Sequence, residues 1–411
     1  MIKRGIAILF ALLLCVSPLP IQANSETQIS AAYAYAVDLQ TMQVLYERNA
    51  DEKMYPASMT KVLTVLTAMD QIDDLDEEVT ITLDMLAGLE DGTYTLTGFL
   101  AKEVVTMRDL LYGAMLPSGA DACQALAVAL YGSEEAMVEA MNAKANELGM
   151  THSHFTNTVG MHDEQHYTTA QDLAVLMKAA WNNEDIRTAM STKKYATSSS
   201  YYHGDGISLK NTWALEQQAA GIEDGHILGG KTGYTPEASY CFFGVCEIDE
   251  LPVIVIVAKT GGDTDDFGRA SMQDVEAICT SIEQNKQPIL LAKEGETIGT
   301  MDLRRTFADP IVLKAPFDLY AWEETSQDLQ LKCVAQKEEA PIQTGEIIAQ
   351  AQIADGEKTL TSVALYATED VDSELFATIV EIITGLLLPL IFMITIIVFV
   401  FYAWQRKKKL R

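Results

Sequence analysis

Apolar residues follow a helical spacing in the middle of the chain and a strand spacing on either side of it. The runs 31–37 and 43–46 surround a polar turn at 38–41 and predict a β-hairpin. Periodicity and capping residues predict helices at 110–115, 122–131, 133–148 and 173–181. Strand character returns at 227–232, 238–246 and 251–258, and a long helix is predicted at 264–283. The order predicts an α+β domain over 24–285, with one antiparallel sheet flanked by helices and a helical subdomain inserted between its strands.

A second, smaller domain follows. Lys286-Gln287-Pro288 predicts a linker, and from 289 to 368 short apolar runs alternate with turns such as Glu294-Gly295-Glu296. This pattern predicts a small all-β sandwich over 286–372. This segment contains no set of catalytic residues of its own, so we expect it to hold the first domain away from a membrane.

Both ends of the chain carry apolar segments. Residues 1–23 predict a secretory signal peptide, with a basic start, an apolar run and Ala23 as the cleavage residue. Residues 379–404 contain a single charged residue, Glu381, and are long enough to span a bilayer as one helix. The basic tail 405–411 follows at once, which places the tail in the cytoplasm and the body outside the cell membrane.

Charge and cysteines exclude two classes of function. The net charge of −29 argues against a nucleic-acid partner, which requires a basic surface. An odd number of cysteines remains after removal of the signal, at Cys123, Cys241, Cys246, Cys279 and Cys333. They lack the spacing of a zinc site, so we expect buried thiols, with or without one bridge, and neither a metal nor a cofactor. The oligomeric state stays open.

The most informative stretch is Tyr55-Pro56-Ala57-Ser58-Met59-Thr60-Lys61, which precedes the apolar run 62–69. Pro56 suits the first turn of a helix, and the run predicts that this helix is buried. Ser58 and Lys61 then share one face, and a lysine at the edge of a dry core has a lowered pKa and can act as a base. Ser191-Thr192-Lys193-Lys194 repeats the spacing in a polar stretch, where we expect a solvated loop.

Two further segments could complete a site. Ser118 lies in a tight loop between two predicted helices. Within 227–235, glycines on both sides of Lys231-Thr232 would let a ligand approach the strand closely. An acyl substrate could add to this strand as an extra strand, with Lys231 holding an anionic carboxylate. The N–H groups of Tyr234 and Ser58 could then face the developing oxyanion.

Together, Ser58-x-x-Lys61, Ser118-Gly119-Ala120 and Lys231-Thr232-Gly233 resemble the three motifs of the penicillin-binding protein and serine β-lactamase superfamily. The segments 56–61, 149–157 and 167–174 resemble more closely the D-alanyl-D-alanine carboxypeptidases, the low-molecular-mass penicillin-binding proteins. The resemblance covers about residues 30–370 and implies a β-lactamase/transpeptidase-like fold. Residues 341–371 resemble that family's C-terminal β domain.

The resemblance also implies roles. Ser58 corresponds to the acylated nucleophile, Lys61 to its general base and Ser118 to a proton relay. The substrate-binding positions are Lys231, Thr232, Gly233, Tyr234 and Arg269, of which Arg269 would contact the terminal carboxylate. The implied reaction removes the last D-alanine from a peptidoglycan stem peptide ending in D-Ala-D-Ala, with β-lactams as covalent inhibitors.

One position departs from the family pattern. The second motif usually ends in asparagine, whereas this chain has Ala120. Two alternatives therefore accompany the carboxypeptidase hypothesis. The first is a catalytically weakened penicillin-binding or wall-sensing module. The second is a β-lactamase, which the sequence favours less because no Glu-x-x-x-Asn segment precedes Lys231 to supply a deacylating base.

Overall fold

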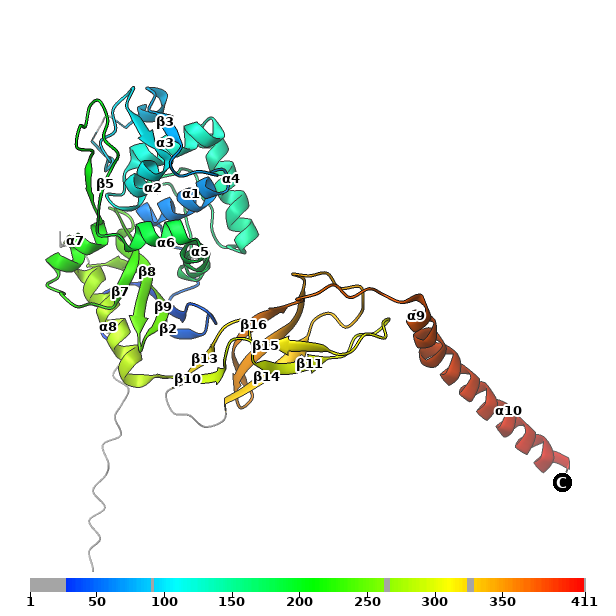
Figure 1. Cartoon of the computed structure of the whole chain (residues 1–411). Helices are drawn as coiled ribbons and strands as arrows, with labels where there is room; N and C mark the ends of the chain where they lie inside the picture. The colour runs from blue at the N-terminus through cyan, green and yellow to red at the C-terminus, as the bar shows by residue number, and fades with distance from the viewer. Residues whose placement is uncertain (1–26, 90–91, 262–266, 324–328, 410–411) are drawn as a thin grey trace, which may run out of the picture.

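The computed structural model describes residues 27–89, 92–261, 267–323 and 329–409, so the predicted signal peptide lies outside it. Three parts follow one another along the chain, an α+β body, a β-rich part and a long C-terminal helix (Figure 1). This is the predicted fold class.

The body is built on a five-stranded antiparallel sheet with the strand order β2-β1-β9-β8-β7. Its strands are β1 (Tyr33–Asp38), β2 (Val44–Arg48), β7 (Ile227–Thr235), β8 (Ser239–Ile248) and β9 (Leu251–Thr260). Strand β7 forms one edge of the sheet. The two ends of this part of the chain meet in the sheet because β1 pairs with β9, as the pattern predicted.

Central strands are apolar on both sides because a core lies on each face of the sheet. On β9, Val253, Val255 and Val257 face the core that includes α8 (Arg269–Asn285). Ile254, Ile256 and Ala258 alternate with them and face the helical core on the other side. Helix α8 begins at Arg269, with Gly268 as its left-handed N-cap, and the predicted start at 264 lies outside the described residues.

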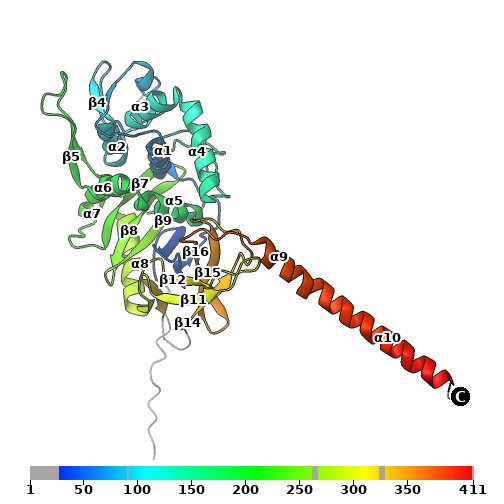
Figure 2. The same cartoon turned by 45° about the vertical axis from the view of Figure 1, so that its right-hand side comes forward.

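The second face of the sheet carries the helical subdomain (Figures 1 and 2). Its helices are η1 (Ala57–Met59), α1 (Thr60–Met69), α2 (Met107–Met115), α3 (Ala120–Tyr131), α4 (Glu134–Leu148), α5 (Ala170–Asn182) and α6 (Glu184–Ser191). Capping sets their ends. Thr106 and Asp109 form a capping box at the start of α2, and Gly132 and Gly149 end α3 and α4 in the left-handed conformation.

Smaller elements complete the body. They are β3 (Glu78–Thr80), η2 (Asp84–Leu86), β4 (Val104–Thr106), β5 (Lys194–Ala196), β6 (Ser208–Lys210) and α7 (Thr212–Ala219). The second Ser-x-x-Lys copy falls at the end of α6 and the start of β5, and Lys194 is exposed there.

The β-rich part has a separate core. It comprises β10 (Gln287–Ala292), β11 (Thr297–Met301), β12 (Ile311–Lys314), β13 (Leu319–Glu323), β14 (Leu329–Ala335), β15 (Ile347–Asp355) and β16 (Lys358–Tyr366), paired as β10-β13, β11-β12 and β14-β15-β16. The predicted linker is wrong, because Gln287 and Pro288 already pair with β13. A proline fits there because its partner Trp322 uses its backbone N–H and C=O for Gln43 and not for β10, so the missing N–H breaks no ladder bond.

Trp322 on β13 joins this part to the body. Its indole N–H donates to the Asp38 carboxylate at 3.0 Å, and its backbone exchanges two hydrogen bonds with the Gln43 side chain. The β1–β2 hairpin therefore contacts the β-rich part, in addition to the direct connection of the chain from α8 into β10.

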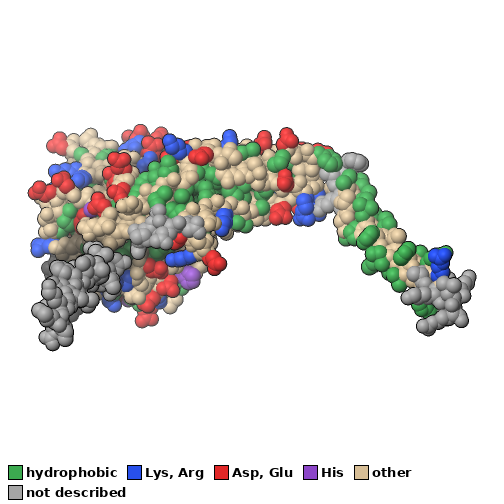
Figure 3. Space-filling model, turned by 90° about the horizontal axis from the view of Figure 1, so that it is seen from below, with side chains coloured by type: hydrophobic (Ala, Val, Ile, Leu, Met, Phe, Trp, Pro, Cys, Tyr) green, Lys and Arg blue, Asp and Glu red, His purple; other side chains and the backbone are tan. Residues whose placement is uncertain are grey.

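The chain ends in α9 (Leu375–Ile382), a π-helical turn (Ile383–Leu387) and α10 (Leu388–Lys409). Within them, Thr378–Tyr402 is long and apolar enough to cross a membrane, by length and composition. None of its most apolar window is buried against the rest of the protein. Figure 2 shows this helix projecting away from the body, and Figure 3 shows apolar side chains on its surface.

Candidate active site

The helical turn at Ser58 brings a hydroxyl and an amine together. Helix η1 runs directly into α1, so Ser58 and Lys61 lie on one face, and Lys61 Nζ is 2.8 Å from Ser58 Oγ. Ser58 is half-buried, whereas Lys61 is only 3% exposed. Burial lowers the pKa of Lys61 to about 8, although Cys123 and Asp121 act in the opposite direction. The amine can therefore lose its proton close to neutral pH.

A backbone carbonyl makes the second contact of Lys61. Lys61 Nζ donates to Val159 O at 2.7 Å. The loop that presents this carbonyl is held by Asn157, whose Oδ1 accepts the N–H groups of Val159, Gly160 and Met161 at 2.8–3.3 Å. Ala120 has no side-chain group that could accept a hydrogen bond from Lys61. The backbone carbonyl of Val159, in the loop held by Asn157, accepts one instead.

Gly160 lets this loop lie directly against the turn that carries Ser58. Its φ is +83°, and a Cβ placed on it would lie 1.7 Å from Ala57 O. Ala57 is itself left-handed, with φ +46°. The position of Ser58 thus depends on an approach between two backbones that only glycine permits.

Replacing Gly160 by alanine should therefore disturb the site more than the same change at Gly149. Both glycines have φ +83°, but a Cβ on Gly149 meets nothing within 4 Å. We expect Gly149→Ala to cost about 1–2 kcal/mol from the left-handed backbone alone, and Gly160→Ala about 2–5 kcal/mol because the clash is added. Chemical denaturation measures both, and equal losses would show that the contact with Ala57 is unimportant.

Ser118 lies in the loop between α2 and α3, as predicted. Its φ is +67° and it is 7% exposed. Its Oγ is buried and has no hydrogen-bond partner among the described residues. An orphaned hydroxyl in a strained loop is free to bond to a reacting group.

Asp121, three residues further on, does not take the place of the missing asparagine. Its carboxylate accepts the N–H groups of Thr97, Gly98 and Phe99. It is therefore committed to holding a neighbouring loop.

Strand β7 brings the third motif to the same place. A Cβ on Gly233 would lie 3.1 Å from Ser58 N, so this strand passes directly beside the serine. Lys231 is fully buried, and its Nζ donates to Thr232 O at 3.0 Å. Burial and the Lys61 charge lower the pKa of Lys231 to about 7, against the opposing effect of Glu216. The two lysines are thus close enough to influence each other.

Thr212 ties the Ser118 loop to β7. Its N–H donates to Leu116 O at 3.1 Å, and its hydroxyl accepts from Thr232 Oγ1 at 2.7 Å. The structure therefore connects the three predicted motifs, although they are far apart in sequence.

The remaining predicted residues lie toward the surface. Tyr234 is 54% exposed, with its ring centroid 4.5 Å from that of Tyr240. Arg269 is exposed as the first residue of α8. Sequence reasoning missed Val159, because a backbone carbonyl has no residue signature, and Glu216, which carried no motif.

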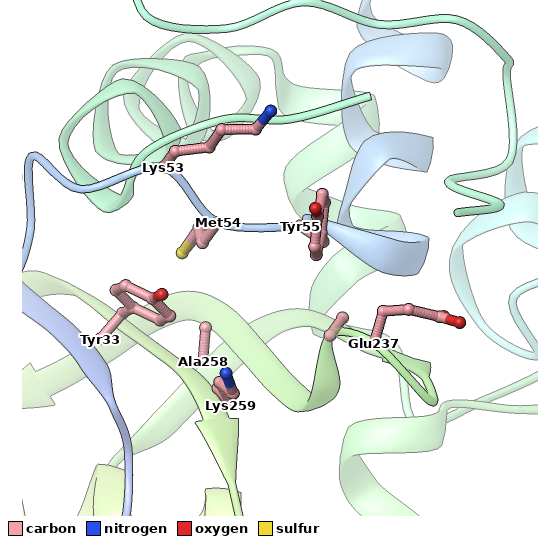
Figure 4. A pocket seen from close by; sticks show the side chains of 8 residues that line it. Tyr33, Lys53, Met54, Tyr55, Glu237, Ala258 and Lys259 are labelled. Carbon is pink, nitrogen blue, oxygen red and sulfur yellow. The ribbon is translucent and has the colours of Figure 1, made fainter. Parts of the chain in front are cut away.

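A small cavity lies beside the segment that leads into Ser58 (Figure 4). It holds about 60 Å³ and is lined by residues of β1, β9, the β7–β8 turn and the 53–55 segment, among them Tyr33, Met54, Tyr55 and Ala258. At roughly 30 Å³ per water, this is room for about two water molecules and not for a peptide.

The cysteines of the body and of the β-rich part form no disulfide among the described residues. The five described cysteines are free thiols. Cys123 lies near both lysines, and burial raises its pKa to about 12. Within the described ranges, no group of three or more His, Cys, Asp or Glu side chains is placed to hold a metal.

Comparison with known families matches two segments of the chain. Residues 21–261 match the D-alanyl-D-alanine carboxypeptidase family, and residues 287–373 match the penicillin-binding protein 5 C-terminal domain. The chain is similar to D-alanyl-D-alanine carboxypeptidase DacF of Bacillus subtilis, with 28% identity over 87% of this chain and 90% of the relative. It is 31% identical to the D-alanyl-D-alanine carboxypeptidase of Streptomyces sp. K15 over 60% of this chain and 82% of the relative.

Solved structures of related proteins have a similar fold. A Streptomyces K15 DD-transpeptidase mutant superimposes with a TM-score of 0.55 at 29% identity, over 62% of this chain and 98% of that one. Penicillin-binding protein 5 of Haemophilus influenzae, at 22% identity, shares the fold with a TM-score of 0.66, over 84% of this chain and 98% of that one. The chain therefore belongs to the D-alanyl-D-alanine carboxypeptidase family of serine peptidases that act on peptidoglycan, and it carries the C-terminal domain of penicillin-binding protein 5.

Proposed function

We propose that this carboxypeptidase trims the terminal D-alanine from peptidoglycan stem peptides through an acyl-enzyme on Ser58. The observation that carries the assignment is the 2.8 Å contact between Ser58 Oγ and a buried Lys61 whose pKa is about 8. A serine hydroxyl becomes a nucleophile only when a base takes its proton, and this lysine is within hydrogen-bond reach.

Acylation begins when the neutral Lys61 amine takes the proton from Ser58 Oγ. The oxygen attacks the carbonyl carbon of the penultimate D-alanine, and the N–H groups of Ser58 and Tyr234 stabilise the oxyanion. The C–N bond then breaks as Ser118 Oγ gives its proton to the leaving amine of the last D-alanine and takes up the proton that Lys61 holds, so Lys61 is neutral again. In the second half, Lys61 takes a proton from water, and the water oxygen attacks the ester carbonyl carbon. The ester C–O bond breaks, Ser58 Oγ takes the proton back from Lys61, and the shortened peptide leaves with its new carboxylate.

Substrate binding uses the open edge of β7. A peptide that adds to this edge as a further strand would run past Gly233, whose missing side chain lets β7 lie close against the turn that carries Ser58. Lys231, Thr232 and Arg269 then hold the terminal carboxylate, a group that hydrogen-bond donors and positive charge favour.

Penicillins carry a carboxylate and a reactive acyl group, so we expect them to acylate the same serine. The test is mass spectrometry after incubation with a penicillin, together with an assay of D-alanine release from a D-Ala-D-Ala peptide. An adduct on Ser58 and release of D-alanine support the proposal. An adduct on Ser118 or elsewhere would overturn the assignment of the nucleophile.

We further propose that the C-terminal helix anchors the protein in the cell membrane, with the catalytic body outside. Ending the chain after Ser373 should move the protein from the membrane fraction to the soluble fraction, because it removes the apolar helix Thr378–Tyr402. D-alanine release from a soluble peptide should stay within about twofold, since surface changes away from a site have small effects. Fractionation of cells expressing both forms is the measurement, and a truncated protein that still sediments with membranes would contradict the anchor.

A further inference from the structure

Glu216 on α7 lies between the two elements that carry the proposed carboxylate-binding cations. Thr212 and Glu216 are four residues apart on α7 and therefore share a face. Thr212 on that face accepts the hydroxyl of Thr232, the residue after Lys231. The face that carries Glu216 is therefore directed at β7.

The other side of Glu216 meets the start of α8. A Cβ on Gly268 would lie 2.2 Å from Glu216 Oε2, so the carboxylate packs directly on this glycine. Gly268 has φ +70° and is the N-cap of the 17-residue helix α8, whose first residue is Arg269. A carboxylate at the N-terminus of a helix is stabilised by the exposed N–H groups and by the helix dipole.

We propose that Glu216 is a positioning residue for substrate recognition, which keeps Lys231 charged and fixes the start of α8 so that Lys231 and Arg269 converge on the terminal carboxylate of the peptide. This inference rests on the proposed function and adds to it a residue that none of the three motifs contains.

The charges around Lys231 explain why such a residue is needed. Three ionisable groups act electrostatically on Lys231. They are Lys61 on α1, Cys123 on α3 and Glu216 on α7. Burial and Lys61 lower the pKa of Lys231 to about 7, whereas Glu216 raises it. The mechanism requires Lys61 without its proton and Lys231 with its proton. In the free protein the pKa of Lys61, about 8, lies above that of Lys231, about 7, and Glu216 makes this difference smaller because its charge supports the proton on Lys231.

The test is the pH dependence of kcat/KM in Glu216→Gln, which keeps the shape of the side chain and removes its charge. Two thioester acyl donors serve as substrates, identical except that the leaving group carries a carboxylate in one and a neutral carboxamide in the other. Glu223→Gln removes a charge from an exposed position just after α7 and is the matched control. Glu216→Asp keeps the charge and tests rescue.

For the carboxylate donor we expect Glu216→Gln to match the wild type near pH 5.5, where Lys231 holds its proton in both proteins. Each unit by which the pKa of Lys231 falls should cost about tenfold in kcat/KM by pH 8. For the carboxamide donor the two proteins should agree within about twofold at every pH, and Glu223→Gln should behave as the wild type. Glu216→Asp should recover most of the loss.

Two results would overturn the inference while leaving the proposed function standing. One is a pH profile unchanged in Glu216→Gln. The other is an equal loss with both donors, which would mean that Glu216 serves only the fold. If Glu216→Gln does not fold, Glu216→Ala, which also removes the charge, takes its place with the same two donors. A purely structural role would then give an equal loss with both donors at every pH. A wild-type protein without D-alanine release would instead refute the proposed function itself.

Discussion

Ser58→Ala should abolish D-alanine release and covalent penicillin labelling together. Removal of the nucleophile from a catalytic serine unit lowers the rate by roughly 10⁴-fold or more, because the remaining groups cannot form the acyl-enzyme. The fold should survive, since Ser58 is half-buried and its hydroxyl bonds only to Lys61 among the contacts that the structure records. The measurements are D-alanine release, penicillin labelling and the midpoint of thermal unfolding.

The second Ser-x-x-Lys copy offers a matched control. Ser191 ends α6 and Lys194 is exposed on β5, so Ser191→Ala should leave both activities within about twofold of the wild type. Penicillin labelling that persists in Ser58→Ala and disappears in Ser191→Ala would reverse our assignment.

The second large effect is expected for Lys61→Met, which fills a similar volume without a basic nitrogen. A general base contributes about 10²–10⁴-fold, so acylation by penicillin should slow by that factor. In the wild type, acylation should fall at acidic pH, because the pKa of Lys61 is about 8 and protonation removes the base. In Lys61→Met the residual rate of acylation should no longer decrease as the pH is lowered, because the titrating base has been removed.

Removing Lys61 should also change the other lysine. The Lys61 charge lowers the pKa of Lys231, so Lys231 should hold its proton to higher pH in Lys61→Met. The alkaline limb of the residual acylation rate should therefore move to higher pH. Stopped-flow acylation between pH 5 and 10 measures both limbs, with Lys194→Met as the control. A wild-type acidic limb in Lys61→Met would mean that another group is the base.

Several features could be predicted from the sequence because they depend on local patterns. The β8–β9 hairpin follows from two apolar runs around Asp249-Glu250, and the helices of the subdomain follow from capping residues and periodicity. The pairing of Ser58 with Lys61 follows from a spacing of three residues in a buried helix.

Element boundaries were less predictable where pairing with a distant strand competes with local composition. Lys286-Gln287-Pro288 has the composition of a linker, yet pairing with β13 makes Gln287 and Pro288 part of a strand. Partner strands that lie far away in the sequence override local composition, because each ladder bond satisfies a backbone group that would otherwise need water.

The sequence by itself determined the pairing of Ser58 with Lys61 and the glycine-flanked strand, because each depends on a few consecutive residues. Only the tertiary structure decided what surrounds them. The Val159 carbonyl on Lys61, the approach of Gly160 to Ala57 and the place of Glu216 between β7 and α8 all join segments distant in sequence. Such contacts are made by backbone atoms and by packing between elements, and neither leaves a pattern that can be read from neighbouring residues.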